Sequence, residues 1–171
     1  MASTSIQTVP SSFTSAFSKP QPEYDVFLNF RGEDTRYKFT DHLYHALVGK
    51  EIITFRDDKE LKRGGPISQE LLDAIEKSRT AVIIFSKNYT FSTWCLEELA
   101  KIVECRDKGI LTVLPIFYHV KPTDVRHQNE TFAKAFAEHE KCFQENPEKV
   151  QKWRVALTYV ANISGDHLMD G

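Results

Sequence analysis

Cysteine is scarce in this chain and poorly placed for cross-links or metal binding. The 171 residues include three cysteines, Cys95, Cys105 and Cys142, which are widely spaced and form no Cys-x-x-Cys pair. An odd number of cysteines without paired spacing argues against a disulfide framework and against structural zinc. We therefore expect reduced thiols, no bound metal ion and a cytoplasmic or nuclear location.

Long apolar runs and an excess of one charge are missing too. No stretch approaches the roughly 20 apolar residues of a membrane helix. No apolar segment near the start has the pattern of a signal peptide. The 22 basic and 24 acidic residues leave a net charge of −2. This balance gives no support for a membrane-surface protein or a general nucleic-acid binder.

Several catalytic signatures are absent as well. There is no Gly-x-Gly-x-x-Gly fingerprint, Walker loop or Gly-x-Ser-x-Gly elbow, which disfavours a Rossmann cofactor site, a P-loop and a hydrolase elbow. His42 and His45 lie one helical turn apart but have no third ligand nearby, so they make a poor metal site. Asp25 begins its strand instead of ending it, which is the wrong end for the phospho-acceptor of a receiver domain.

The chain divides into a tail and one domain. Residues 1–22 are rich in Ser, Thr, Gln and Pro and contain no acid, so we expect this tail to be disordered. A transit peptide is the alternative, although Lys19 is its one charged residue. Residues 23–171 have the length of one ordinary domain, and we expect it to be the N-terminal part of a longer protein.

Short apolar segments alternate with helical periodicities from Tyr24 onward. Strands are expected at 26–30, 52–55, 81–85 and 111–118, and helices at 39–47, 67–75, 94–105, 132–143 and 150–160. This alternation predicts an α/β fold with a parallel sheet and helices on both faces. A fifth strand would lie between residues 143 and 150 or near the C-terminus, where no apolar run marks it.

Three local expectations follow from the same pattern. Glu33 and Asp34 should lie at the positive N-terminal end of the helix that contains Phe39. Pro66 is well placed at a helix start. Pro115, inside the fourth strand, implies a bulge or an edge position.

The first candidate site follows the first strand. The carboxyl end of a strand is the usual ligand side of a parallel sheet. There Gly32 lets the backbone approach a ligand closely, and the Arg31 guanidinium suits a phosphate. The alternative is a tight turn with an exposed arginine. A second basic loop, residues 62–65, could close over a ligand, or it is an ordinary solvated loop.

The helix that begins near Trp94 carries the second candidate site. Its buried stripe leaves Glu97 pointing toward solvent, whereas Glu98 lies one turn after Trp94 on the same side. An aromatic face and a carboxylate could therefore line one pocket. The alternative is that Trp94 anchors the core and Glu98 is a surface charge.

A single carboxylate suits cleavage of the nicotinamide–ribose bond of NAD. The nicotinamide is positively charged in the substrate and leaves neutral, so it needs no general acid. One glutamate can stabilise the oxocarbenium-like state and hold the ribose hydroxyls while Trp94 stacks on a ring.

Several ordered motifs together resemble a known family. Segments 25–36, 55–58, 63–64, 94–99 and 115–118 are similar to those of the TIR domain of plant intracellular immune receptors. The resemblance runs from Tyr24 to Gly171. It implies a flavodoxin-like fold with a five-stranded parallel sheet. It also implies NAD+ or NADP+ cleavage that is switched on by self-association, with nicotinamide and ADP-ribose-type signals as products, in plant defence. NAD(P)+ would be substrate, and no cofactor is implied.

The resemblance assigns roles to individual residues. Glu98 takes the place of the catalytic glutamate, which decides between it and Glu97. Six further residues match substrate-pocket positions: Arg31 and Gly32 after the first strand, Arg63 and Gly64 in a mobile loop, and Trp94 and Cys95 beside the glutamate.

Self-association in this family uses the first and last helices. A Ser-His pair is common at its centre, and here the matching residues are Asp41 and His42. Asp41 would either face its own copy and weaken association, or pair with His42 across the interface at lower pH. Asn29 replaces a serine common in the first motif, and we expect little effect from it.

The resemblance leaves two main functions. One is an NAD(P)+ glycohydrolase gated by oligomerisation, whose partners are itself, other TIR domains and the rest of the receptor. The other is a non-catalytic adaptor that only assembles. The joint presence of Glu98 and Trp94 favours the enzyme. Cyclic-nucleotide or nuclease chemistry on nucleic acid gains no support from the near-neutral charge.

Overall fold

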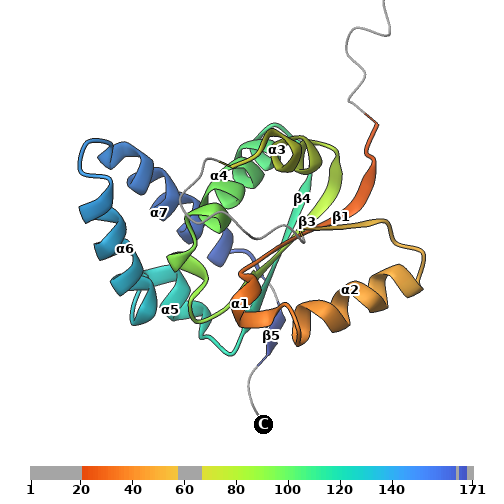
Figure 1. The fold of residues 1–171 in the computed structure, drawn as a ribbon, viewed down its shortest axis with the longest axis horizontal. Helices are drawn as coiled ribbons and strands as arrows, with labels where there is room; N and C mark the ends of the chain where they lie inside the picture. The colour runs from red at the N-terminus through yellow and green to blue at the C-terminus, as the bar shows by residue number, and fades with distance from the viewer. Residues whose placement is uncertain (1–20, 58–66, 165, 169–171) are drawn as a thin grey trace, which may run out of the picture.

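Five parallel strands form one sheet in the computed structural model, which describes residues 21–57, 67–164 and 166–168. The strand order is β2-β1-β3-β4-β5, which is the flavodoxin-like order, and Figure 1 labels four of these strands, β1, β3, β4 and β5. The strands are β1 (Tyr24–Phe30), β2 (Thr54–Arg56), β3 (Ser78–Phe85), β4 (Thr112–Tyr118) and β5 (Asp166–Leu168). The predicted parallel sheet is confirmed.

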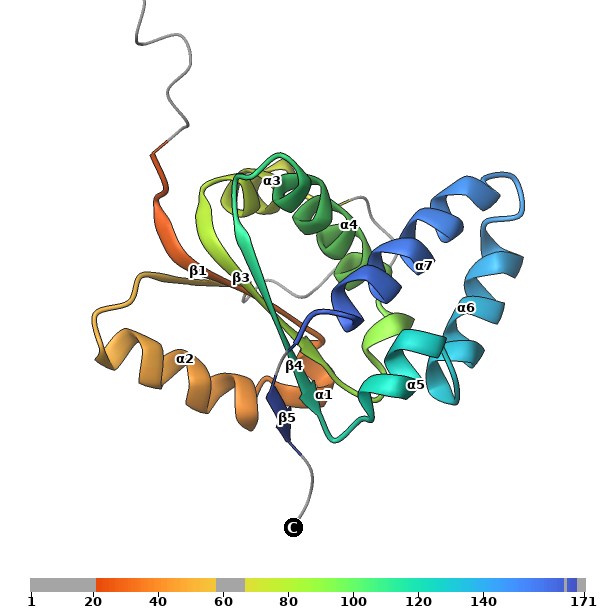
Figure 2. The ribbon, with the colours of Figure 1, turned by 180° about the vertical axis from the view of Figure 1, so that it is seen from behind.

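Helices cover both faces of the sheet, as the alternation predicts. Figures 1 and 2 show α2 on one side of the sheet and α3, α4 and α7 on the other. The helices are α1 (Gly32–Thr35), α2 (Phe39–Gly49), α3 (Gln69–Glu76), α4 (Thr93–Asp107), α5 (Pro122–His127), α6 (Thr131–Cys142) and α7 (Pro147–Ala161), with a 3-10 turn η2 (Tyr89–Phe91).

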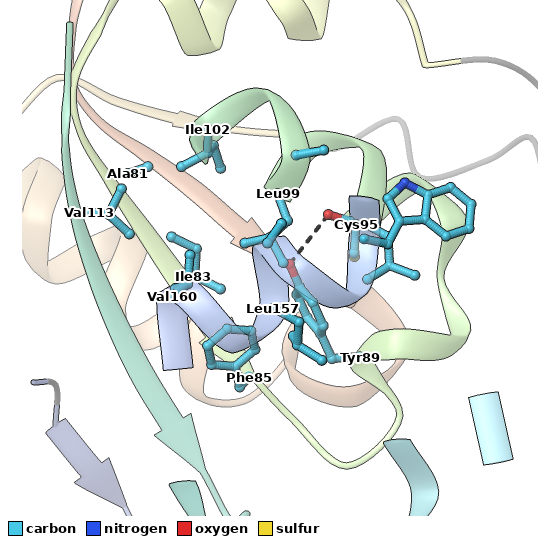
Figure 3. Close-up of a cluster of buried hydrophobic side chains, with 14 of the residues drawn as sticks. Ala81, Ile83, Phe85, Tyr89, Cys95, Leu99, Ile102, Val113, Leu157 and Val160 are labelled. Atoms are coloured by element: carbon cyan, nitrogen blue, oxygen red, sulfur yellow. Dashed lines mark hydrogen bonds between the residues drawn. The ribbon is translucent and has the colours of Figure 1, made fainter. Parts of the chain in front are cut away.

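The larger core lies between the sheet and α4 with α7. Figure 3 shows its centre, where Leu99 and Ile102 of α4 and Leu157 of α7 pack toward Ile83 of β3. The smaller core lies on the α2 side, where Phe39, Leu43 and Leu47 pack against five buried side chains of the sheet: Leu28, Phe30, Val82, Ile84 and Ile116. Residues 81–85 are all buried, because helices cover both faces of a central parallel strand.

The fifth strand is β5, near the C-terminus. Its three residues pair with Ile116–Tyr118 of β4. Three residues are too few for an apolar run, which explains why the pattern did not mark this strand. Pro115 of β4 lies opposite Ile83 of β3 and directly precedes the residues that pair with β5. Residue 165, next to β5 on that side, lies outside the described residues, so the expected bulge or edge position stays a prediction.

One helix prediction was wrong in detail, and one helix was not predicted. Glu33 and Asp34 do not begin the helix of Phe39, because they form the separate one-turn helix α1. The short α5, which begins at Pro122, was not predicted. Helix α3, which was predicted near Pro66, begins at Gln69. Ser68 is its N-cap, and the Ser68 side chain accepts a hydrogen bond from the backbone nitrogen of Leu71. Pro66 and almost all of the expected tail, residues 1–22, lie outside the described residues.

Candidate active site

The loops that follow β1 and β3 meet at one place on the edge of the sheet. β1 and β3 are hydrogen-bonded neighbours, with Phe30 opposite Ile84 at their carboxyl ends. β2 lies on the other side of β1, so the strand order reverses between β1 and β3. This reversal is where flavodoxin-like sheets bind ligands. The candidate residues after β1 and those around η2 and α4 are therefore brought together.

Glu98 is buried at this place and bonded to the first strand. It exposes 4% of its surface, and its Oε2 accepts a hydrogen bond of 2.7 Å from Nδ2 of Asn29. The alternative that Glu98 is a surface charge is therefore wrong. A buried carboxylate needs polar partners, and Asn29 supplies one of them.

Tyr89 completes a chain of hydrogen bonds through Asn29. Its hydroxyl donates to Oδ1 of Asn29 at 2.5 Å and lies 3.3 Å from the carbonyl oxygen of Cys95 (Figure 3). Burial is the largest cause of the raised pKa of Tyr89, and the nearby Cys95 and Glu98 raise it further. The phenol therefore stays neutral and remains a hydrogen-bond donor at neutral pH.

Asp34 joins the loop after β1 to the loop after β3. One carboxylate oxygen, Oδ2, accepts hydrogen bonds from Oγ of Ser86 at 2.5 Å and from the backbone nitrogen of Asn88 at 3.0 Å. The other oxygen, Oδ1, accepts from Nη1 of Arg31 at 2.9 Å. This aspartate fixes the position of the arginine that the sequence singles out.

Arg31 is held by acids instead of pointing into solvent. Besides Asp34, it contacts Oε2 of Glu33 through Nη2 at 2.8 Å. Its side chain is 20% exposed, so the alternative of an exposed arginine in a tight turn is wrong. Gly32 is buried and begins α1. A phosphate at this place would share the guanidinium with the two carboxylates.

Trp94 and Cys95 lie in the first turn of α4. The nitrogen of Cys95 donates to Oγ of Ser92, which is the N-cap of the helix. The Cys95 thiol is buried and donates to the carbonyl oxygen of Phe30, so it packs α4 onto β1. Trp94 is half-buried against the core. Its Nε1 is buried without a hydrogen-bond partner among the described residues.

Glu97, next to Glu98, faces α7 instead of solvent. Its carboxylate forms an ion pair of 2.8 Å with Nζ of Lys149 and its side chain is 29% exposed. The prediction of a solvated Glu97 was therefore wrong in part, because the side chain is partly covered and paired with Lys149. Arg63 and Gly64 lie outside the described residues.

The two residues expected at the self-association surface lie on α2. His42 is exposed, whereas the carboxylate of Asp41 is paired with two side chains of the same molecule. The Oδ1 of Asp41 is 3.1 Å from Nη1 of Arg56 and 3.3 Å from Nε2 of His45. The last helix, α7, covers the opposite face of the sheet from α2 (Figures 1 and 2). The expectation that association uses the first and last helices stays a prediction.

The described part of the chain has neither a metal-binding cluster nor a membrane-spanning helix. It contains no group of three His, Cys, Asp or Glu side chains that could hold a metal ion. In the same residues, no helix is both long and apolar enough to cross a membrane.

Sequence reasoning missed the residues that support the glutamate. Tyr89 lies 60 residues from Asn29 and Glu98 lies 69 residues from it, so no local spacing connects them. One signal was available, because Asn29 is a polar residue on the apolar first strand. A buried polar side chain in such a run must find a hydrogen-bond partner.

Chemically, this arrangement offers an ionisable carboxylate, a neighbouring indole and a guanidinium. The carboxylate can stabilise positive charge, the indole can stack on a ring, and the guanidinium can bind an anion. The three belong to one edge of the sheet, and all three were singled out from the sequence.

Comparison with known proteins gives one consistent family. Residues 23–170 match the family model described as the TIR domain. The chain is 54% identical over 170 residues to disease resistance protein RPV1 of Vitis rotundifolia, covering 99% of this chain and 12% of that protein. It is 53% identical over 151 residues to TMV resistance protein N of Nicotiana glutinosa, covering 88% and 13%.

A solved structure agrees in fold. The TIR domains of the activated Roq1 resistosome, which directly recognizes the pathogen effector XopQ, are 58% identical with a TM-score of 0.77, covering 85% of this chain and 87% of that one. The chain spans about an eighth of the length of the two curated relatives.

Proposed function

This chain belongs to the TIR domain family, and from that premise we propose that it is an NAD(P)+ glycohydrolase activated by self-association. The domain extends over residues 23–171 and forms part of a plant disease-resistance receptor. Its products are nicotinamide and ADP-ribose-type signals for innate immunity and cell death. The supporting context is the identity of 53–54% to two disease resistance proteins.

One observation carries the proposal: Glu98 is a buried carboxylate held by a hydrogen bond at the ligand edge of the sheet. In the reaction, the nicotinamide–ribose bond breaks and the nicotinamide leaves as a neutral molecule. As this bond breaks, positive charge builds up on the ribose, and a water molecule then adds to the anomeric carbon and releases a proton to solvent. The Glu98 carboxylate stabilises that positive charge in the transition state, and such electrostatic stabilisation is usually the largest contribution to catalysis.

Two neighbours bind the substrate. Trp94 stacks on a ring one helical turn before Glu98. Its Nε1 has no hydrogen-bond partner among the described residues and is a donor that bound substrate can use. Arg31 and the backbone at Gly32 bind the phosphates after β1. Cys95 supports both by holding α4 against β1.

Burial of Glu98 gives a physical reason for gating. With 4% of its surface exposed, the carboxylate has little access to a substrate ribose, so groups around it must move before catalysis. We infer that association supplies this movement. Tethered copies in a receptor oligomer reach an effective concentration of roughly millimolar, at which a weak interface forms.

The association surface that we propose is centred on α2. His42 is exposed there, and α2 is on the face of the sheet away from α4 and α7. The TIR domains of the similar Roq1 protein come from an activated resistosome, which supports assembly of this domain with its own copies or with other TIR domains.

The test is nicotinamide release from NAD+ and from NADP+ over a wide range of protein concentrations, with and without a crowding agent. We expect release per chain to rise steeply with concentration and to vanish in Glu98→Ala. Glu97→Gln is the matched control, because it changes the neighbouring carboxylate, whose partner is Lys149 on α7. It should keep activity within about twofold.

Two results would count against the proposal. Full turnover at nanomolar protein, independent of concentration, would contradict gating by association. No release from any variant, in samples where light scattering demonstrates assembly, would favour the non-catalytic adaptor.

A further inference from the structure

Asn29, Tyr89 and Glu98 form a hydrogen-bonded chain that connects three separate elements. Asn29 lies on β1, Tyr89 begins η2 and Glu98 is on α4. Tyr89 and Asn29 have no exposed surface, and Glu98 is nearly as buried. Contacts at this depth are shielded from water, so their direction and strength matter more than at the surface.

The chemistry of the three groups fixes the direction of each bond. The amide oxygen Oδ1 of Asn29 can only accept, so the Tyr89 hydroxyl must be its donor at 2.5 Å. This bond turns the amide so that its nitrogen, Nδ2, faces Oε2 of Glu98 at 2.7 Å. The same nitrogen lies 3.5 Å from the carbonyl oxygen of Cys95.

We propose that Asn29 is a positioning residue that orients the Glu98 carboxylate for catalysis, and that Tyr89 fixes the amide of Asn29 in the orientation that this requires. The inference rests on the proposed glycohydrolase function. A short bond from an amide nitrogen to a carboxylate oxygen favours one rotamer of the glutamate. A fixed orientation is needed by a group that stabilises positive charge on a ribose.

The proposal revises the expectation that Asn29 has little effect. A serine at this position ends at Oγ, one bond closer to the backbone than the amide nitrogen. Its hydroxyl is too short to place a donor where Nδ2 now lies while also meeting the Tyr89 hydroxyl. The asparagine is therefore a specific feature of this chain's site and not a neutral polar replacement.

The kinetic test compares Asn29→Asp, Asn29→Ser and Tyr89→Phe with the unchanged chain under assembling conditions. Asn29→Asp keeps the side-chain shape but replaces the donor with an acceptor. We expect its kcat to fall roughly tenfold to a hundredfold while KM changes by less than about threefold. Asn29→Ser and Tyr89→Phe should show smaller falls in kcat. Tyr24→Phe is the control, because Tyr24 packs on Phe55 away from this chain of bonds, and it should leave kcat unchanged.

A second measurement does not depend on activity. The Asn29 side-chain amide gives a pair of proton–nitrogen NMR signals, which are identified by their loss in Asn29→Asp. We expect these signals to shift in both Glu98→Ala and Tyr89→Phe and to stay in place in Glu97→Gln. Thermal unfolding of each variant shows whether a loss of activity merely reflects unfolding.

The outcomes separate this inference from the proposed function. Unchanged kcat in folded Asn29→Asp, in a chain whose activity depends on Glu98, would overturn the positioning role while leaving the glycohydrolase intact. Asn29 amide signals that do not shift in Glu98→Ala would overturn the positioning role even if no nicotinamide were released. If no nicotinamide is released but the Asn29 amide signals shift in Glu98→Ala and Tyr89→Phe, the enzyme proposal is rejected. The hydrogen bonds among Asn29, Tyr89 and Glu98 are then structural only, and a positioning role of Asn29 in catalysis is rejected with it.

Discussion

Asp34 accepts a hydrogen bond of 3.0 Å from the backbone nitrogen of Asn88, which joins α1 to the loop after β3, 54 residues later in the sequence. The same carboxylate oxygen accepts from Oγ of Ser86 at 2.5 Å. Through these bonds, the segment that follows β1 is fastened to the segment that follows β3. The proposed phosphate-binding arginine, Arg31, is fixed to the same carboxylate, so this one side chain organises the ligand edge of the sheet.

Replacing Asp34 should therefore destabilise the domain. We expect Asp34→Ala to lower the free energy of unfolding by about 2 to 4 kcal/mol, because it leaves Ser86, the Asn88 nitrogen and Arg31 without a mostly buried acceptor. Urea denaturation measures this change. Glu33→Ala is the control, since Glu33 is largely exposed and its ion pair with Arg31 should contribute less than about 1 kcal/mol. Equal losses in the two variants would contradict a central role for Asp34.

Arg31 should affect substrate binding more than the chemical step. If its guanidinium binds a phosphate of NAD(P)+, Arg31→Ala should raise KM by about tenfold or more and change kcat little, because the contact is the same in substrate and transition state. Steady-state nicotinamide release measures both constants. Arg31→Lys should recover only part of the affinity, since an ammonium cannot bind bidentately. A fall in kcat without a change in KM would assign Arg31 to the chemistry instead.

Replacing Glu33 tests phosphate binding by Arg31 in the opposite direction, because KM should fall instead of rise. Its carboxylate lies 2.8 Å from Nη2 of Arg31 and competes there with a substrate phosphate. Neutralising it in Glu33→Gln should lower KM by about twofold to threefold, which corresponds to less than about 1 kcal/mol for a largely exposed ion pair. A raised KM would show that Glu33 helps to orient the arginine.

Most of the fold could be predicted because it depends on local periodicity. The strands near 26–30 and 81–85 and the helices near 94–105 and 150–160 are marked by apolar spacing that the structure reproduces. β5 was not located because its three residues are fixed by pairing with β4 and have no apolar pattern of their own. Likewise, Asp34 looked like an acid at a helix end, since nothing local connects it to Ser86.

The candidate site likewise contains residues that local sequence predicts and residues that it does not. Arg31, Trp94 and Glu98 were identified by motif, and the structure places them at one edge of the sheet. The partners that determine how they act, Asn29 and Tyr89, are set by tertiary contacts across 60 or more residues. A single sequence carries no direct record of such contacts, except that a buried polar residue requires a partner.

Asp41 should not repel its own copy strongly, because its charge is paired within the chain. Its Oδ1 contacts Nη1 of Arg56 at 3.1 Å, and the Arg56 guanidinium also lies over the ring of Tyr44 at 4.1 Å. Arg56→Ala should expose the negative charge of Asp41 on α2 and weaken self-association by roughly threefold to tenfold. Sedimentation velocity over a range of protein concentrations measures the dissociation constant.

The double variant distinguishes charge from lost packing. If repulsion by Asp41 causes the weakening, adding Asp41→Ser to Arg56→Ala should restore association, whereas Asp41→Ser alone should change it by less than about threefold. Failure of the double variant to recover would mean that Arg56 contributes by packing on Tyr44. A strong gain from Asp41→Ser alone would show that Asp41 does face its own copy.

The three cysteines should differ sharply in reactivity. Cys142 is exposed at the end of α6, whereas Cys95 and Cys105 are buried. Burial is the largest cause of the raised pKa of the Cys105 thiol, so at pH 8 this thiol is neutral as well as inaccessible, and the thiolate is the reactive form. Alkylation with iodoacetamide followed by mass spectrometry should modify Cys142 first and Cys105 at a rate limited by opening of the core.

The same shift makes stability depend on alkaline pH. The unfolded chain releases its thiol proton near the ordinary cysteine pKa of about 8.5, but the folded chain holds the proton of Cys105 to higher pH. The stabilisation is therefore fully present below about pH 8 and is lost as the pH rises through the raised value. Urea denaturation at pH 7.5 and pH 9.5 should show a smaller loss of unfolding free energy in Cys105→Ala than in the unchanged chain. Cys142→Ala is the control, since an exposed thiol should contribute no such difference, and equal pH dependence in all three proteins would contradict the assignment to Cys105.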